Sequence, residues 1–199
     1  MSTFIPQDTS ILLRLKRDTQ SIHCSLEERV DLLNSVRTTG SYRALLENFY
    51  GLYCPYETAL QQSMPTIHQW LPDIQSRTRI EALRMDLTIL GNSSPHNLSQ
   101  ATIPPLQTIA DMFGCLYVLE GSTLGGQIIS RHIHEKLNYT PDSGCAFFSG
   151  YGTDIGAFWM KFCSAIEAYS ATHPEDNDAI VASATRTFQT FYHWTARDQ

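Results

Sequence analysis

The strongest constraint on the fold is the spacing of apolar residues near the N-terminus. From Ile11 to Val36 they recur every three or four positions, which places them on one stripe of an α-helix. The members of that stripe are Leu12, Leu15, Thr19, Ile22, Leu26, Val30 and Leu33. Asp8, Thr9 and Ser10 precede it and are residue types that cap a helix start. The pattern predicts a helix over residues 11–36 with one face against a core.

The same helical periodicity continues along the chain. Further helices are expected over residues 41–63, from residue 76 to Gly91, over residues 104–137, over residues 154–170, and from Pro174 to Trp194. Pro55 should kink or restart the second of these helices. The uncharged segment 88–110 is rich in Ser, Asn, Gln and Pro and is expected to be a loop. We therefore predict an all-α fold, a single irregular helical bundle spanning residues 1–199.

Composition narrows the classes of function. With 20 acidic and 14 basic residues the formal charge is −6, which disfavours a nucleic-acid binder. No stretch approaches the roughly 20 apolar residues of a membrane span. The five cysteines are far apart without a Cys-x-x-Cys pair, and the N-terminus lacks the basic and apolar regions of a signal peptide. We therefore expect reduced thiols in a cytoplasmic protein that binds neither nucleic acid nor membrane.

Polar residues follow one edge of the first predicted helix. Thr19, His23 and Glu27 are spaced by four and share a face, and Lys16 lies on that face two turns before His23. A neutral imidazole is a good ligand for iron, and a carboxylate four residues on can hold its second nitrogen. An ordinary solvated helix edge with a His–Glu pair would show the same row. The spacing alone leaves both interpretations open.

A glycine-rich segment, GSTLGGQ from Gly121 to Gln127, interrupts the apolar pattern of residues 104–137. Each glycine costs a helix about 1 kcal/mol relative to alanine, so either the helix breaks or something needs the backbone to come very close. Gly121 and Gly125 are four apart and would bare one patch of main chain, against which a flat ligand could lie. Close helix packing or a kink would also explain the glycines.

Cations are scarce enough for their positions to be informative. Lys16, Arg131 and Lys161 are candidate partners for the carboxylates of a ligand, although a solvated surface charge explains Lys161 better. His132 and His134 point to different sides of a helix and make a poor metal pair. The chain contains no phosphate-binding loop, no His-Glu-x-x-His motif and no Gly-x-Ser-x-Gly elbow, so those chemistries are not indicated.

Taken together, four segments resemble the heme oxygenase family. The family's first helix is similar to Leu15–Glu27 (LKRDTQSIHCSLE), and its glycine-rich distal helix is similar to Leu116–Ile129 (LYVLEGSTLGGQII). Its second helix is similar to Phe49–Glu57 (FYGLYCPYE), and a late segment of bacterial members is similar to Gly150–Trp159 (GYGTDIGAFW). The resemblance covers residues 11–170 with order and spacing preserved. It points to the bacterial, biliverdin-producing branch found beside bacteriophytochromes.

The resemblance implies a fold, a reaction and a set of residues. It implies a heme oxygenase-like bundle in which heme b is both cofactor and substrate and His23 is the iron ligand. The candidate heme-binding residues are Lys16, Thr19, His23, Glu27, Gly121, Gly125, Gly126 and Arg131, and the candidate catalytic residues are Gly121, Ser122 and Gly125. The products would be biliverdin, carbon monoxide and ferrous iron, formed with O2 and an electron donor such as ferredoxin or a reductase. A bacteriophytochrome is a candidate acceptor of the biliverdin.

Ser122 departs from the family pattern and keeps two alternatives open. Mammalian-type members carry an aspartate directly after the first distal glycine, where it organises water near bound oxygen. With Ser122 there, a heme-binding protein of the same fold without turnover is one alternative. The other is a non-heme member of the fold, thiaminase-like or di-iron, for which His23, Glu27, Glu57 and Glu120 would have to converge.

Overall fold

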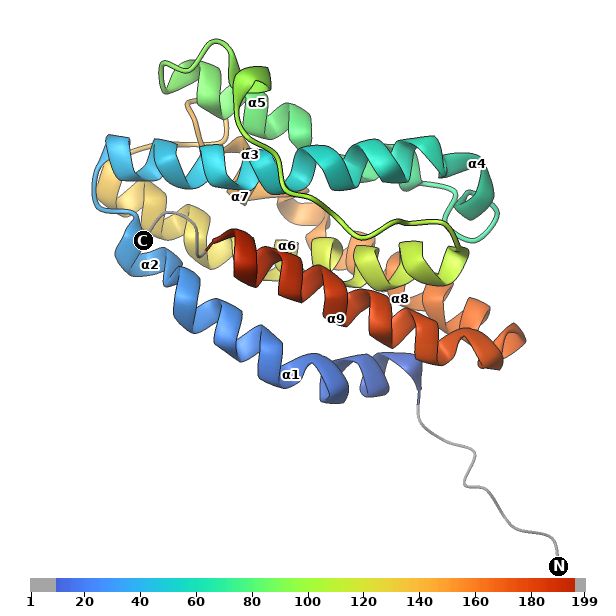
Figure 1. The fold of residues 1–199 in the computed structure, drawn as a ribbon. Coiled ribbons are helices and arrows are strands. Elements are labelled where there is room, and N and C mark those ends of the chain that lie inside the picture. The colour runs from blue at the N-terminus through green and yellow to red at the C-terminus, as the bar shows by residue number, and fades with distance from the viewer. Residues whose placement is uncertain (1–9, 196–199) are drawn as a thin grey trace, which may run out of the picture.

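The computed structural model describes residues 10–195 and is built from helices (Figure 1). In that part of the chain the α-helices are α1 (Ile11–Val30), α2 (Leu32–Ser35), α3 (Thr39–Gln62), α4 (Met64–Ile67), α5 (Ile80–Ile89), α6 (Ile109–Leu137), α7 (Ala146–Ser149), α8 (Ile155–Thr172) and α9 (Asn177–Trp194). Short 3-10 turns lie between some of them: η1 (Ile74–Arg77), η2 (Pro95–Asn97), η3 (Gly152–Asp154) and η4 (Pro174–Asp176). The described residues form no β-strand, and the all-α prediction is confirmed. Ser10 caps α1 by accepting the Leu13 N–H at 3.4 Å, whereas Asp8 and Thr9 lie outside the described residues.

The first predicted helix is in fact two helices. α1 ends and α2 begins around Asp31, whose φ of 38° is left-handed. Aspartate tolerates this conformation better than most residues, and its N–H still bonds to the Glu27 carbonyl at 3.0 Å. The prediction of one helix to Val36 is therefore wrong at Asp31. Leu33, beyond the break, is 45% exposed and does not continue the inner stripe.

α3 passes through Pro55 without a break, so the helix does not restart there. A proline cannot donate a hydrogen bond to the carbonyl four residues earlier, which here belongs to Gly51. That carbonyl instead accepts the N–H of Ala101 at 2.9 Å, from the segment between α5 and α6. A Cβ on Gly51 would lie 2.5 Å from the Ser99 carbonyl oxygen, so the missing side chain is what lets this segment cross α3 so closely. A contact from far along the chain thus replaces the hydrogen bond that the proline removes.

α6 carries the glycine-rich segment and is continuous over 29 residues. It starts at Ile109 and not at Pro104, because Thr108 and Asp111 form a capping box at that point. The helix runs through Gly121–Gly126 without interruption. A helix break is therefore excluded as the reason for these glycines.

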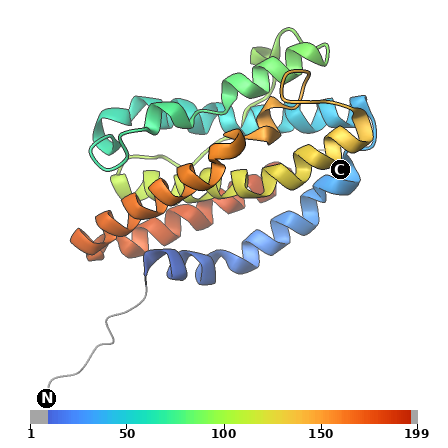
Figure 2. The same ribbon diagram turned by 180° about the vertical axis from the view of Figure 1, so that it is seen from behind.

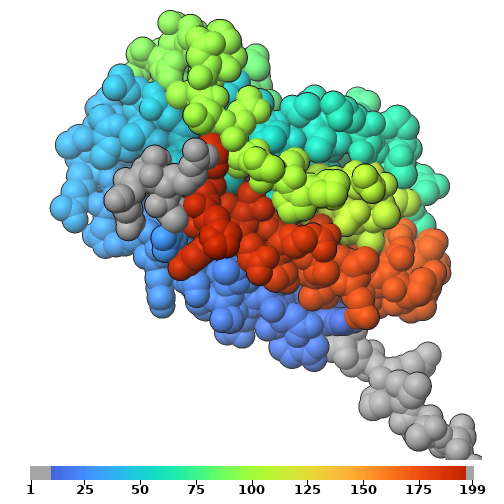
Figure 3. All heavy atoms as spheres, in the orientation of Figure 1, coloured from blue at the N-terminus to red at the C-terminus, as the bar shows by residue number. Residues whose placement is uncertain are grey.

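Three helices, α1, α6 and α9, run in the same direction (Figure 1). α1 and α6 both pack against α9 and have few direct contacts with each other. α3 and α5 pack together on the side of α6 that is remote from α1, and α8 runs against α6 (Figure 2). Figure 3 shows the surface of α9 as a band between α1 and the segment that leads into α6. None of the helices formed by the described residues is long and apolar enough to cross a membrane.

Candidate functional site

α1 holds the predicted polar row, and part of that row is exposed. Thr19 is buried and donates its hydroxyl to the Leu15 carbonyl at 2.7 Å. His23 and Glu27, one and two turns further along, keep 51% and 66% of their side chains exposed. His23 Nε2 lies 3.5 Å from Glu27 Oε1, and the imidazole ring lies 5.3 Å from the ring of Phe188 in α9. The carboxylate and the phenyl ring therefore position an imidazole that stays accessible from outside.

The three glycines of α6 have different surroundings. A Cβ on Gly126 would lie 2.5 Å from the carbonyl oxygen of Phe148 in α7, so close packing explains this glycine. A Cβ on Gly121 would come no closer than 3.9 Å to a neighbour, the indole of Trp159, and a Cβ on Gly125 would have no described atom within 4 Å. Packing thus does not require glycine at these two positions. Close packing thus accounts for Gly126 without a ligand, whereas Gly121 and Gly125 bare the main chain on an open side of α6.

Exposed apolar side chains lie beside these two glycines. Leu124 is 44% exposed and Ile128 is 65% exposed. We call Gly121, Leu124, Gly125 and Ile128 the glycine face, because they share one side of α6 at helical spacing. Large apolar side chains left in water mark surfaces that bind partners or ligands. Two neighbouring glycines keep this surface flat, so it suits a flat apolar ligand.

A contact between α1 and α6 aligns the histidine with the glycine face. The Thr19 hydroxyl interacts with the phenol of Tyr117, and the two helices run in the same direction (Figures 1 and 2). His23 lies four residues beyond Thr19, about 6 Å further along α1. Gly121 lies four residues beyond Tyr117, about 6 Å further along α6. His23 and Gly121 are therefore at the same level on the two helices that flank α9.

Ser122, next to the glycine face, belongs to a hydrogen-bonded pair. Its hydroxyl lies 2.7 Å from the Leu119 carbonyl oxygen, to which it donates, and 2.8 Å from the hydroxyl of Tyr53 in α3. A serine hydroxyl has one proton, so Tyr53 must be the donor in the second hydrogen bond. Ser122 then retains one free acceptor position. Burial raises the pKa of Tyr53 to about 12, which keeps its phenol protonated at neutral pH.

Sequence reasoning missed Tyr53 as a functional residue. It lies on the inner side of α3, where an aromatic residue is an ordinary core residue, and its ring is indeed buried against Phe147 and Phe191. Its place in the segment similar to the family's second helix was the one available signal. The Tyr53 hydroxyl points to a role beyond core packing only because the structure places it in a hydrogen bond with Ser122.

Arg131 lies away from the other predicted site residues. It follows Gly125 by six residues, about 9 Å along α6, whereas Lys16 precedes His23 by about 10 Å in the opposite direction. Because α1 and α6 run the same way, Lys16 and Arg131 are about 25 Å apart along the helices. They cannot hold one pair of neighbouring carboxylates. Both side chains are exposed, and neither forms an ion pair with a described residue.

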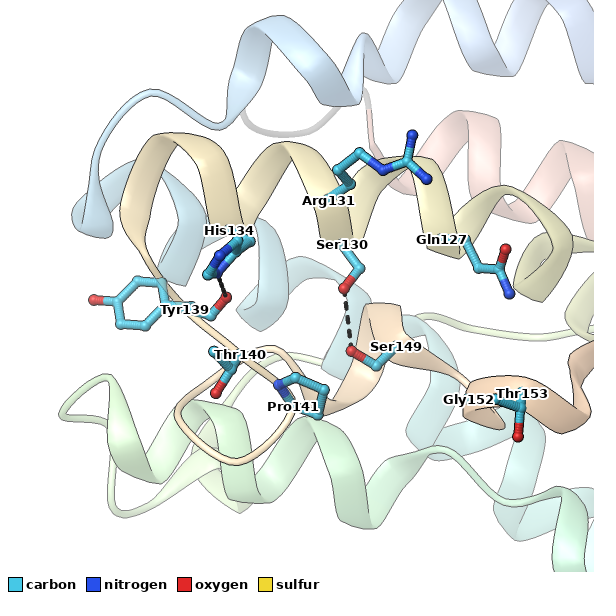
Figure 4. Close-up of a pocket in the computed structure, with 10 residues that line it drawn as sticks. All are labelled: Gln127, Ser130, Arg131, His134, Tyr139, Thr140, Pro141, Ser149, Gly152 and Thr153. Carbon is cyan, nitrogen blue, oxygen red and sulfur yellow. Dashed lines mark hydrogen bonds between the residues drawn. The ribbon is translucent and has the colours of Figure 1, made fainter.

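Arg131 is one of the residues that line a cavity of about 550 Å³ on another side of α6. Figure 4 shows Ser130 of α6 and Ser149 of α7 pointing toward each other across it, joined by a hydrogen bond of 3.1 Å. The other lining residues are Gln127, His134, Tyr139, Thr140, Pro141, Gly152 and Thr153. Neither His23 nor any residue of the glycine face lines this cavity. The cavity is thus separate from the site that α1 and α6 share.

The carboxylates required by a non-heme site do not converge. Glu57 is buried and accepts two backbone N–H groups at the start of α5, at 2.5 and 3.1 Å. Glu120 is buried and accepts a hydrogen bond of 2.6 Å from Arg77. Both carboxylates are therefore held by partners other than the exposed His23 and Glu27. Among residues 10–195, no three His, Cys, Asp or Glu side chains are grouped so that they could hold a metal ion.

The fold and the site together define an all-helical protein with an accessible histidine on α1 at the level of an open glycine face on α6. Comparison with known proteins identifies the family. The family model described as Heme oxygenase matches residues 9–197. A heme oxygenase of Xanthomonas campestris pv. campestris (strain 8004) is 30% identical over 157 residues, 76% of this chain and 87% of that protein. The chain therefore belongs to the heme oxygenase family.

Solved structures of heme oxygenases share the fold. The NO- and CO-bound heme oxygenase of Neisseria meningitidis matches with a TM-score of 0.78 and 21% identity, over 94% of this chain and 91% of that one. Heme oxygenase 2 of Chlamydomonas reinhardtii, solved without heme, matches with a TM-score of 0.78 and 16% identity, over 96% and 98% of the two chains. The predicted heme oxygenase-like helical fold is confirmed.

Proposed function

We propose that this chain is a heme oxygenase that cleaves heme to biliverdin, carbon monoxide and ferrous iron. The observation that carries the proposal is the alignment of an accessible His23 with two glycines for which the protein's own packing gives no reason. A flat ligand between α1 and α6 supplies that reason. One face of the ligand would meet an imidazole and the other would meet bare main chain.

The residues present suit heme b in size, polarity and charge. The accessible imidazole of His23 is a suitable iron ligand, and Glu27 can fix its orientation. Leu124 and Ile128 offer apolar contact to the porphyrin plane. Lys16, exposed and without an ion pair among the described residues, can bind the carboxylates of the heme at one end of the site.

Heme supplies the iron centre that activates O2 and is also the substrate, so the protein's work is to position it and to manage protons. Ser122 is the polar side chain next to the glycine face that can hold a water molecule, through its one free acceptor position. Tyr53 fixes the orientation of the Ser122 hydroxyl from behind. In this proposal the Tyr53–Ser122 pair performs the water-ordering task for which related enzymes use an aspartate.

The proposed reaction needs partners that supply electrons and receive product. O2 is the oxidant, and its reduction requires an external donor such as ferredoxin or a reductase. One meso carbon leaves as carbon monoxide, the two flanking pyrroles gain carbonyl oxygens, and the remaining oxygen leaves as water. The resemblance to the branch found beside bacteriophytochromes makes such a photoreceptor a candidate acceptor of biliverdin, in the cytoplasm.

Hemin titration followed by reduction tests the proposal. The wild-type protein should bind hemin with a Soret band typical of histidine ligation, and ascorbate or ferredoxin-driven turnover should bleach that band and yield biliverdin. His23→Ala should lose the nitrogen-ligated spectrum and the turnover, and added imidazole should restore part of both. His134→Ala is the matched control, because His134 is an exposed histidine that lines the separate cavity on α6. A stable hemin complex that never bleaches would favour the alternative of heme binding without turnover, and failure to bind hemin would reject both.

A further inference from the structure

One aromatic side chain limits the glycine face at one end. The atoms nearest to a Cβ built on Gly121 are Cη2 and Cζ3 of Trp159 in α8, both at 3.9 Å. These atoms belong to the far, six-membered ring of the indole. One turn further along α6, a Cβ on Gly125 has no described neighbour within 4 Å. The glycine face is therefore bordered by a rigid ring edge beside Gly121 and is open beside Gly125.

Aromatic packing holds the Trp159 ring in place. Its ring centroid lies 5.5 Å from that of Phe162 and 6.0 Å from that of Tyr117. Phe162 is fully buried, and Tyr117 is the residue that interacts with Thr19 of α1. The indole of Trp159 is thus held between Phe162 of its own helix, α8, and Tyr117 of α6, which interacts with α1.

A buried arginine, Arg77, links the two residues that directly precede Gly121 and Trp159. Arg77 donates to Glu120 at 2.6 Å, and also to the carbonyl oxygen of Phe158 at 3.1 Å. The Arg77 and Glu120 side chains are 0% and 3% exposed, so water does not compete for this ion pair. Glu120 directly precedes Gly121, and Phe158 directly precedes Trp159. The hydrogen bonds of Arg77 therefore hold Gly121 and the indole of Trp159 next to each other.

We propose that Trp159 is a specificity-determining residue, whose indole edge limits how far heme can slide or rotate in its plane on the glycine face. This inference rests on the proposed function. The four meso carbons of heme differ little in intrinsic reactivity, so the choice among them depends on which one the protein places at the reactive position. Contact with carboxylates at the Lys16 end fixes one edge of the heme, and a wall beside Gly121 restrains rotation about the iron. In this arrangement Arg77 and Glu120 act as positioning residues for the wall.

Substitution of Trp159 tests the inference with a readout that needs no turnover. Trp159→Leu removes the ring edge but keeps an apolar side chain, and Trp159→Phe keeps a ring between Phe162 and Tyr117 but retracts its edge. In the cyanide complex of bound hemin, the hyperfine-shifted methyl resonances report the orientation of the porphyrin by NMR. We expect a second set of methyl resonances in Trp159→Leu and a smaller one in Trp159→Phe. The ratio of minor to major biliverdin isomers should rise about tenfold in Trp159→Leu, which corresponds to ~1.4 kcal/mol.

Trp70→Leu is the matched control for the loss of an indole. Trp70 packs on Tyr169 of α8. Tyr169 follows Trp159 by ten residues, which places it about 15 Å further along that helix. Trp70→Leu should alter apo stability without changing methyl resonances or isomers. Wild-type methyl resonances and isomers in both Trp159 variants would overturn the inference while leaving the proposed function intact. If Trp159→Leu does not fold, Trp159→Phe decides alone, since an unchanged pattern there has the same meaning. Failure of the wild type to bind or cleave hemin would instead reject the proposed function.

Discussion

Alanine substitutions at Gly125 and Gly126 should have different effects on apo stability. Alanine is about 1 kcal/mol more favourable than glycine inside a helix, and α6 is continuous through both positions. A methyl group on Gly125 would meet no described atom within 4 Å, so nothing offsets this gain. For a chain of this size, 1 kcal/mol raises the melting temperature by about 2–4 °C. Apo Gly125→Ala should therefore melt above the wild type.

Gly126→Ala gains the same helix propensity but meets a neighbour. Its Cβ would lie 2.5 Å from the Phe148 carbonyl oxygen, whereas relaxed carbon–oxygen contacts lie at about 3.3 Å or more. Either α6 or α7 must move by most of an ångström, and overpacking of this kind costs about 1–3 kcal/mol. The net effect is a loss of about 0–2 kcal/mol, so apo Gly126→Ala should melt at or below the wild-type temperature.

The hemin affinity of the Gly125 variants should change in a different way from their apo stability. A methyl group on Gly125 would separate the main chain from the porphyrin, and Gly125→Leu would do so more strongly. We expect the hemin dissociation constant to rise about tenfold in Gly125→Ala, or ~1.4 kcal/mol, and further in Gly125→Leu. Differential scanning calorimetry of the apo proteins and Soret titration measure the two effects separately. A lower apo melting temperature for Gly125→Ala, or unchanged hemin affinity in Gly125→Leu, would refute the argument that this glycine serves a ligand.

Three further results are expected. Glu27→Ala should still bind hemin but shift the Fe–His stretching frequency, because His23 loses the carboxylate that makes its imidazole more basic, and an unchanged frequency would contradict this. Tyr53→Phe should lower the turnover rate about tenfold with little change in hemin affinity, since Ser122 loses its donor; a wild-type rate would argue against the pair. Burial raises the pKa of Glu57 from 4.5 to about 7. Between these two pH values the folded state binds a proton that the unfolded state has released. The contribution of Glu57 to the free energy of unfolding is therefore lost as the pH rises from 4.5 to about 7. Glu57→Gln should remove that decline, which for one proton cannot exceed about 1.4 kcal/mol per pH unit, and identical pH dependence of wild type and variant in chemical unfolding would disprove it.

The parts of the site that could be predicted are those carried by local spacing. Four-residue intervals placed His23 and Glu27 on one face of a helix, and the structure has them there at 3.5 Å. Gly121 and Gly125 likewise share one side of α6. Such relations follow from the period of the helix and need no knowledge of the rest of the fold.

The parts that could not be predicted depend on contacts between distant segments. Pro55 should disturb α3, yet the N–H of Ala101 replaces the lost hydrogen bond from about fifty positions away. The sequence does not distinguish Gly126 from Gly121 and Gly125. In the structure Gly126 alone among these three has a backbone carbonyl, that of Phe148, packed against it. The break at Asp31 was missed for a different reason: the apolar stripe runs on past it, and one aspartate in a left-handed conformation leaves no mark on that spacing.

Which of the two candidate cations, Lys16 or Arg131, suits the site depends on the relative direction of α1 and α6, and residue spacing alone does not give that direction. Lys16 and Arg131 were comparable as partners for ligand carboxylates, because a sequence does not say whether two helices run parallel or antiparallel. In the structure α1 and α6 run the same way, so one cation lies before His23 and the other lies beyond Gly125. Heme carries both carboxylates on one edge, and a single end of the site must therefore receive them. Lys16 is on the same helix and the same face as His23, the proposed iron ligand, whereas Arg131 lines a separate cavity. Under the proposed function the carboxylates are therefore expected at the Lys16 end, with the edge of the heme without carboxylates toward the Arg131 end of α6.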